Sequence, residues 1–332
     1  GEWFAETKKR GMGFSVNNTW HTENHEYRRG PTQVMIKLNP DGTVILDAPT
    51  VEVGTGSNNC AVLACAETLG VSPEDVRWIS VQDTQTGLKD QVQTDSAVSY
   101  ILSESVHHCA LDIKSKLLEK VGRKMNRKPE ELDISEGRIF VKASPEIGMT
   151  IKEYYDSIDL FTEDSLIPLT SFYTRPLSME DFGTAYMATF VEVEVDTETG
   201  QVEVLRMVVA SDGGTIIFPP GAEGQLVGGQ CQGLGEALYE GMIYDEATGI
   251  PLNFNFIDYK FPTMADWPDI DPILMEVYKG RGVYGCSGMG EGAPCCTPRA
   301  IENAVYNAIG VRINETPITP IKVLEALGKA GE

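Results

Sequence analysis

The segment from residue 219 to residue 242, PPGAEGQLVGGQCQGLGEALYEGM, constrains the fold more than any other part of the sequence. Its apolar residues recur at near-helical intervals, yet glycines stand throughout it. A glycine inside a helix costs ~1 kcal/mol relative to alanine, so several are kept only where something must approach closely. The sequence therefore predicts a helix with one side very close to another part of the molecule or to a ligand.

A second glycine-rich stretch, GCSGMGEGAPCCTPRAIENAVYNAIG at 285–310, surrounds a single acid, Glu291. Thr297 followed by Pro298 is typical of a helix N-cap and first turn, and Gly310 is typical of a helix end. Glu291 is then expected about two turns before that helix. The local pattern leaves two alternatives: a loop that only turns the chain, or a loop that brings a carboxylate and backbone close to a ligand.

Two hairpins are predicted from alternating apolar and polar residues. The first spans 33–53 around a Pro-Asp-Gly turn at 40–42. The second spans 185–214, with its turn at Thr199 and Gly200. Strands of this kind, interleaved with helices, predict the α+β fold class.

Two further helices are expected between the hairpins. GTGSNNCAVLACAETLG begins at Gly54 and predicts a glycine turn, a helix capped by Ser57 or Asn58, and a helix end at Gly70. Unpaired N–H groups at such a helix start suit a phosphate or another anion. Residues 96–121 carry an apolar stripe that predicts a longer helix.

The chain length predicts more than one lobe. At 332 residues the chain exceeds the usual ~100–200 residues of one domain. We expect two α/β lobes of mixed sheets and helices, residues 1–180 with the loop 54–57 and residues 181–332 with the loop 285–294.

The charge restricts the possible partners. A net charge of -22 and a pI near 4.6 argue against nucleic acid and anionic membrane surfaces, because both would repel the chain. No apolar run approaches ~18 residues, and the N-terminal segment lacks the order of a signal peptide. The sequence therefore predicts a cytoplasmic protein.

The cysteines and histidines show no metal-site spacing. The seven cysteines include no C-x-x-C pair and stand mostly among apolar or small residues, so we expect buried free thiols, with the adjacent pair Cys295 and Cys296 as an exception to watch. Packing or surface roles are expected for the histidines, and no nucleophile-plus-base pairing is recognisable. The four histidines are His21, His25, His107 and His108.

Five segments together resemble a known family. They are VEVGTGSNNCAVLACAETLGV, DQVQTDSAVSY, GQLVGGQCQGLGEALYE, FIDYKFPTMADWPDI and GMGEGAPCCTPRAIENAVYNAIGVRI. Their order and approximate spacing are similar to the C-terminal half of the molybdenum-binding subunit in the xanthine dehydrogenase and aldehyde oxidase family. The family's usual N-terminal half is missing, so the chain looks like part of a split subunit, most similar to the medium molybdopterin subunit of nicotinate dehydrogenase.

The resemblance assigns roles to individual residues. It implies that Glu291 is the active-site base, that Gly290 approaches the ligands of the metal, and that Gln225 hydrogen-bonds the pterin. No side chain is expected to bind molybdenum directly. Thr55 replaces a glutamine that is frequent in the family, which puts a side-chain hydrogen bond there in doubt. Two further turns are implied to contact the cofactor: Gly54, Thr55, Gly56 and Ser57, and Thr94, Asp95, Ser96, Ala97 and Ser99.

The resemblance also implies cofactors and partners. A molybdopterin cytosine dinucleotide with molybdenum would be shared with a larger molybdopterin subunit, while iron–sulfur clusters and FAD would lie on other subunits. The implied reaction is hydroxylation of an N-heterocycle with water as the oxygen source, with nicotinate to 6-hydroxynicotinate as the leading case. A carboxylate in a dry pocket suits the proton step, because desolvation raises its pKa. The alternatives are a split purine or other heterocycle hydroxylase and a non-catalytic pterin-binding or assembly subunit.

An aromatic and polar N-terminal stretch is a further candidate. Trp20, Tyr27 and Arg28 could reach a substrate carboxylate, although an ordinary surface loop is the simpler interpretation of these residues. The sequence alone does not identify the residues that select the substrate.

Overall fold

The computed structural model of the chain describes residues 7–20, 32–79, 83–85, 87–89, 93–94, 96–159, 168–175 and 184–329. These form two compact units. Unit 1 comprises Gly1–Trp20, Thr184–Lys279 and Met289–Glu332, and unit 2 comprises His21–Gly183 and Gly280–Gly288. The units therefore differ from the predicted lobes of residues 1–180 and 181–332. Residues 1–20 belong to unit 1 together with the later part of the chain, and residues 280–288 belong to unit 2 together with the earlier part.

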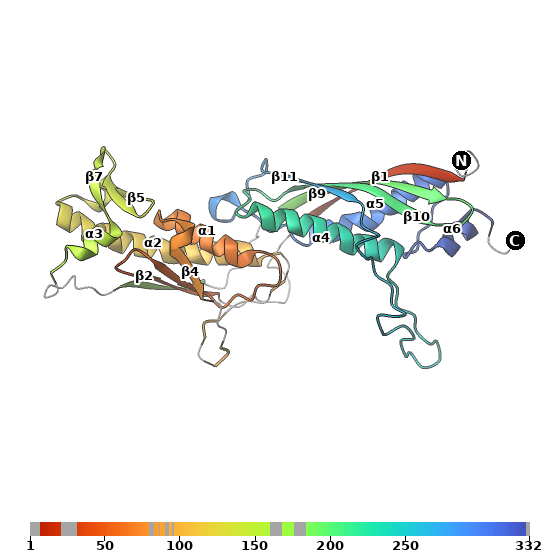
Figure 1. Ribbon diagram of the computed structural model, residues 1–332, viewed down its shortest axis with the longest axis horizontal. Coiled ribbons are helices and arrows are strands. Elements are labelled where there is room, and N and C mark those ends of the chain that lie inside the picture. The colour runs from red at the N-terminus through yellow and green to blue at the C-terminus, as the bar shows by residue number, and fades with distance from the viewer. Residues whose placement is uncertain are drawn as a thin grey trace. The chain divides into compact units, whose positions relative to one another are not determined.

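Unit 1 contains a four-stranded sheet in the order β1-β9-β10-β11 (Figure 1). The central hairpin is formed by β9 (Thr184–Asp196) and β10 (Val202–Asp212), as predicted. The strand β1 (Lys8–Trp20) pairs antiparallel with β9, and β11 (Asp269–Met275) pairs parallel with β10. The pairing of β1 with β9 explains why the N-terminal strand belongs to unit 1.

Two helices pack with this sheet, α4 (Pro219–Leu238) and α5 (Gly292–Ile309). The valines of β9 that face the helices are fully buried, and so are Ile301 and Ala304 of α5. A Cβ added at Gly11 of β1 would lie 2.2 Å from the carbonyl oxygen of Ala304, so α5 lies almost directly on the backbone of β1. The short helix α6 (Pro320–Ala326) completes the core of the unit through the buried Val323.

The glycines of α4 serve the close approach that the sequence predicted. A Cβ at Gly229 would lie 2.6 Å from the Cβ of Ala293, and one at Gly233 would lie 2.3 Å from the Cβ of Thr297. Real Cβ atoms do not come so close, so the two helices could not pack in this way with larger residues at these positions. The neighbour of α4 is thus α5.

The start of α5 differs from the prediction. The helix begins at Gly292 and not near Thr297, and Pro298 lies inside it. Thr297 is therefore not an N-cap, because its hydroxyl is turned to the neighbouring helix, where it donates to the side chain of Gln230 at 3.0 Å. The predicted helix end is confirmed, since Gly310 is the C-cap residue with φ of 75°.

Unit 2 has a sheet in the order β4-β3-β2-β8, with β2 (Gln33–Leu38), β3 (Val44–Asp47), β4 (Val76–Ile79) and β8 (Leu169–Thr174). The predicted hairpin is β2 and β3, although its second strand ends at Asp47. The helices α1 (Ser57–Leu69) and α2 (Val98–Met125) share the core of this sheet. Figure 1 shows α1 and α2 lying side by side.

A smaller sheet extends unit 2. It consists of β5 (Leu132–Ser135), β6 (Arg138–Val141) and β7 (Ser144–Thr150), and it leads into α3 (Ile151–Asp156). Short 3₁₀ turns lie at Pro73–Asp75, Pro129–Glu131 and Val283–Gly285. Mixed sheets and helices in both units confirm the α+β fold class.

Candidate functional site

The loop before α1 is closed by a glutamate of the chain itself. One carboxylate oxygen of Glu52, Oε1, accepts the N–H groups of Gly54 and Gly56, both at 2.9 Å, and Oε2 accepts the N–H of Asn58 at 3.2 Å. Gly56 is the N-cap residue, with φ of 74°, and no side chain of the cap residue bonds the helix. The predicted caps, Ser57 and Asn58, are therefore wrong.

The carboxylate of Glu52 is held in its charged form. Partial burial acts to raise the pKa of Glu52, but hydrogen bonds from Asn58, Gly56 and Gly54 outweigh it and lower the pKa. A carboxylate at a helix N-terminus also gains from the helix dipole. The expectation of unpaired N–H groups at this helix start is thus wrong for Gly56 and Asn58, because the anion that they bind belongs to the protein.

The predicted turn at residues 94–99 begins α2. Ala97 is the N-cap residue, its N–H donates to the carbonyl of Thr94 at 3.3 Å, and Ser96 has a left-handed φ of 51°. Ser99 makes a side-chain hydrogen bond with Cys60 of α1. Asp95 lies outside the described residues.

The same turn contacts the loop that leads to Glu291. A Cβ added at Gly288 would lie 1.9 Å from the carbonyl oxygen of Ser96, so only glycine allows this approach. Unit 2 thereby brings the turn 94–99, which the resemblance assigned to the cofactor, together with residues 285–288, the first part of the predicted glutamate loop 285–294.

A polar cluster that the sequence did not reveal holds this loop. The hydroxyl of Thr68 donates to the carbonyl of Ala64 at 2.7 Å and lies 2.6 Å from the hydroxyl of Tyr284 and 2.9 Å from Nδ1 of His107. Thr68 has one proton, so when it donates to Ala64 its hydroxyl accepts hydrogen bonds from both Tyr284 and His107. Burial raises the pKa of Tyr284 and lowers that of His107, so both stay neutral. Tyr284 has φ of 61°, the kind of strained backbone found where a loop is held in place.

Glu291 stands at the N-terminus of α5. It is the N-cap residue itself, with φ of -88°, and its side chain makes no capping hydrogen bond. It thus lies at the start of the helix and not two turns before it. The side chain is exposed to solvent, whereas Gly292 and Ala293 behind it are buried. The described part of the chain does not by itself supply the dry surroundings that the sequence led us to expect.

Gln225 lies on the same stripe of α4 as the glycines that contact α5. Gly229 meets Ala293 and Gly233 meets Thr297, so the two helices run parallel and keep step. Residues four apart share a helix face, so Gln225 lies one turn before Gly229 on that face. From this spacing we expect Gln225 to lie near the segment that precedes α5, which contains Gly290 and Glu291.

The thiols are buried, as predicted, with one exception. Of the seven cysteines, Cys295 alone is exposed. Burial raises the pKa of Cys231 and Cys296 to about 11 and that of Cys286 to about 12, which leaves these thiols protonated. Among the described residues, no group of three or more His, Cys, Asp or Glu side chains is arranged to hold a metal ion.

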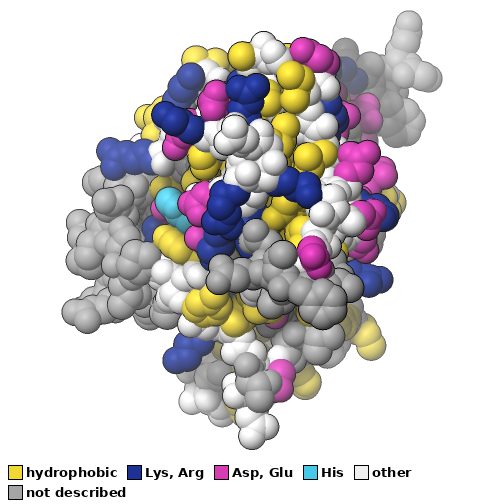
Figure 2. Space-filling model, turned by 90° about the vertical axis from the view of Figure 1, so that its left-hand side faces the viewer, with side chains coloured by type: hydrophobic (Ala, Val, Ile, Leu, Met, Phe, Trp, Pro, Cys, Tyr) yellow, Lys and Arg dark blue, Asp and Glu magenta, His cyan; other side chains and the backbone are white. Residues whose placement is uncertain are grey.

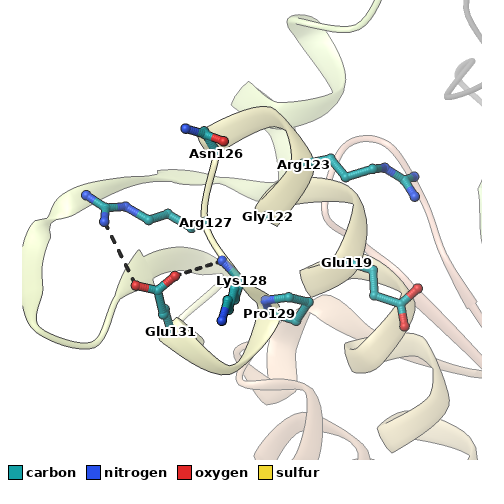
Figure 3. A pocket seen from close by; sticks show the side chains of 8 residues that line it. All are labelled: Glu119, Gly122, Arg123, Asn126, Arg127, Lys128, Pro129 and Glu131. Carbon is teal, nitrogen blue, oxygen red and sulfur yellow. Dashed lines mark hydrogen bonds and ion pairs between the residues drawn. The ribbon is translucent and has the colours of Figure 1, made fainter.

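A pocket with no link to the predicted site lies where α2 ends (Figure 3). Asn126 ends the helix with φ of 52°, and the Glu131 carboxylate accepts the N–H of Lys128 at 2.8 Å and pairs with Arg127 at 3.9 Å. Figure 2 shows this end of the molecule, where basic and acidic side chains are mixed. These residues complete a helix terminus, and none of them was assigned to the cofactor.

Within the described ranges, no helix is long and apolar enough to cross a membrane.

Comparison with known proteins places the whole chain in one group. Residues 2–268 match the model of the molybdopterin cofactor-binding domain. The chain is 32% identical to the xanthine dehydrogenase molybdenum-binding subunit of Escherichia coli, over 97% of this chain and 43% of that subunit. It is 27% identical to the nicotine 6-hydroxylase large subunit of Paenarthrobacter nicotinovorans, over 96% of this chain and 40% of that one.

Solved structures agree. The quinoline 2-oxidoreductase of Pseudomonas putida 86 superposes with a TM-score of 0.88 at 25% identity, over 99% of this chain and 43% of that one. The chain spans less than half the length of the curated relatives it matches. The family match over most of its length nevertheless shows that this chain belongs to the molybdopterin cofactor-binding domain family, among the molybdenum-binding subunits of the xanthine dehydrogenase type.

Proposed function

We propose that this chain supplies part of the cofactor site and the proton-accepting carboxylate of a molybdenum hydroxylase. The observation that carries the proposal is the place of Glu291, which is the N-cap residue of α5 and directly follows Gly290 in unit 1. The family membership of the chain supports it.

The residues present fit a flat cofactor that approaches backbone. A Cβ added at Gly54, Gly224 or Gly228 would meet no described heavy atom within 4 Å, so these glycines leave room beside the loop 54–57 and beside Gln225. We propose that Gln225, Gly290 and the turns at 54–57 and 94–99 hold the cofactor. Glu52 accepts the N–H groups of Gly54, Gly56 and Asn58 and also the hydroxyls of Thr55 and Ser57, at 3.3 and 3.4 Å. What this loop offers a cofactor is therefore chiefly the open space beside its backbone at Gly54.

Glu291 would act as the general base. When bound, the molybdenum–pterin group supplies the two-electron oxidation of the substrate carbon. Glu291 accepts a proton in that step, and a carboxylate can do so only when it is charged and oriented. Gly292 and Ala293, which follow Glu291, are buried, and their packing fixes the backbone from which the Glu291 side chain extends.

The leading substrate is an N-heterocycle, and nicotinate giving 6-hydroxynicotinate is our first proposal. Several relatives are named for ring substrates, such as nicotine, quinoline and xanthine, which supports the heterocycle class. A purine remains the alternative. Tyr27 and Arg28 lie outside the described residues, and of Trp20 only the backbone is described, so their proposed contact with a carboxylate rests on the sequence.

A larger molybdopterin subunit is the proposed partner of this chain. The outward face of β1 exposes Met12, Phe14 and Val16 to 66%, 60% and 69%, and the ring of Phe14 stacks on Phe190 of β9 at 5.8 Å. Apolar faces of this kind usually meet another protein. We further propose that the pterin is the cytosine dinucleotide, that iron–sulfur clusters and FAD lie on other subunits, and that the complex is cytoplasmic.

One experiment tests the proposal as a whole. The native complex would be purified through this chain, analysed for molybdenum and for the nucleotide released from the pterin, and assayed with nicotinate, xanthine and quinoline. Stoichiometric molybdenum with turnover of a heterocycle is expected. A complex that binds the pterin but turns over none of the three would favour the non-catalytic alternative.

A further inference from the structure

Unit 1 contains a glutamine that is fully buried on a helix. Gln230 of α4 has no exposed surface, and neither do its neighbours Thr189 and Thr297. Glutamine is rarely found so deep unless its amide is hydrogen-bonded at both ends. Its surroundings are therefore informative.

The amide of Gln230 joins three elements. Its Nε2 donates to Oγ1 of Thr189 on β9 at 3.2 Å and to the carbonyl of Ala293 on α5 at 3.5 Å. Its Oε1 accepts the hydroxyl proton of Thr297, also on α5, at 3.0 Å. Thr297 can donate its one proton either here or to the carbonyl of Ala293 at 3.0 Å, and the first choice satisfies every group.

The first turn of α5 needs support of this kind. Pro298 has no N–H, so it cannot bond the carbonyl of Pro294 as a residue inside a helix normally would. The turn that follows Glu291 is therefore short of internal hydrogen bonds. Gly229 and Gly233 bring α4 close enough for Gln230 to bond the turn from outside.

We propose that Gln230 is a positioning residue that fixes the first turn of α5 and through it Glu291. The bonded carbonyl of Ala293 is two residues from Glu291, and the turn between them is buried. The claim that Gln230 fixes the first turn of α5 does not depend on the proposed function. Its consequence for catalysis rests on the proposed function.

The test replaces the amide by a group of similar length that cannot hydrogen-bond, Gln230→Met, in the assembled complex. The matched control is Gln232→Met, at an exposed glutamine two residues along the same helix. We expect hydrogen exchange of the backbone amides of residues 292–297 to accelerate by about tenfold in Gln230→Met, because local opening becomes easier. Residues 303–309 and the control should keep wild-type exchange.

Activity gives a second readout. Turnover per molybdenum should fall by about tenfold in Gln230→Met with KM near wild type, and its pH profile should shift, since a displaced base changes its surroundings. Thr297→Val, which removes the hydroxyl at similar volume, should have the same effects. Thr297→Ser keeps the hydroxyl and should behave like the wild type. The double variant Gln230→Met/Thr297→Val should be no worse than either single one.

The outcomes separate the two proposals. Unchanged exchange at residues 292–297 in both Gln230→Met and Thr297→Val overturns the inference, whatever the activity. Faster exchange in these variants, together with full activity of Glu291→Gln, keeps the positioning of the helix and removes the proposed base. Faster exchange with loss of turnover supports both.

Discussion

The N-termini of α1 and α5 look alike in the sequence and differ in the structure. Each follows a glycine-rich loop, and each has one glutamate close by. At α1, the carboxylate of Glu52 binds the N–H groups of its own loop and closes it. At α5, Glu291 is the cap residue, and its side chain does not cap the helix.

The difference shows how position decides the use of a carboxylate. Glu52 lies four residues before Gly56, so the loop can fold back around its side chain. Glu291 lies at the cap position itself, where the helix is stabilised instead from α4 by Gln230. The first glutamate serves the fold, and we propose that the second serves the reaction.

The largest effect is expected at Glu291. Glu291→Gln keeps the size of the side chain but cannot accept a proton, so turnover per molybdenum should fall by ~10²–10⁴. Molybdenum content and thermal midpoint should stay near wild type, because the side chain does not cap α5. A Glu291→Gln variant that loses stability but keeps its turnover per metal would contradict the difference between the two glutamates, because a structural cap would behave in that way.

Gly56→Val should have the next largest effect. Gly56 has φ of 74°, a backbone that costs side-chain-bearing residues ~1–2 kcal/mol, and valine would also disturb the N–H that Glu52 binds. We expect a lower thermal midpoint and lower molybdenum content. Gly310→Val is the control, since Gly310 has φ of 75° at the other end of α5. Equal loss of molybdenum per folded molecule in both variants would show that strain alone explains the result.

Glu52→Gln tests the other half of the comparison. The free energy of unfolding should fall by ~1 kcal/mol at neutral pH, as for loss of an N-cap, while turnover per molybdenum changes little. Because the folded pKa of Glu52 lies below its usual 4.5, its contribution is present above that pH and is lost as the pH falls through the folded value. The stability difference between wild type and variant, measured by denaturation at several pH values, should therefore shrink in acid. A constant difference would contradict the charged cap.

Thr55→Ala should have the smallest effect. The hydroxyl of Thr55 lies 3.3 Å from Glu52, a weak contact on an exposed loop. The free energy of unfolding should change by less than ~0.5 kcal/mol. The molybdenum content should equal that of the wild type within the error of the measurement. A loss of molybdenum larger than that of Gly56→Val would show that the threonine side chain, and not the loop backbone, contacts the cofactor.

Much of the local structure was predictable. The turn at Thr199 and Gly200 and the helix ends at Gly70 and Gly310 were expected, and all are observed with glycine at positive φ. The close approach on one side of α4 was expected from its glycines and is observed against α5. Such features follow from residues near each other in the chain.

The start of α5 shows why other predictions failed. Thr297 and Pro298 have the residue types of an N-cap and a first helical residue, yet the helix begins six residues before Pro298, at Gly292. Contacts from α4 hold the extra turn, and no local pattern reports them. The roles of Glu52 and Tyr284 were missed for a similar reason, since each depends on how the chain folds back on itself.

The sequence by itself determined the two central hairpins, the helices α1, α2 and α4 and the helix ends at Gly70 and Gly310, because apolar spacing and glycine positions act over a few residues. It also determined the family, through five segments in a fixed order. Only the tertiary structure decided that β1 pairs with β9 across most of the chain length, that Glu52 accepts N–H groups of the loop before α1 and of Asn58 within it, and that Gln230 hydrogen-bonds α5. These depend on contacts between residues far apart in sequence or on the path of a loop, and hydrogen bonds of that kind form only once the backbone is in place.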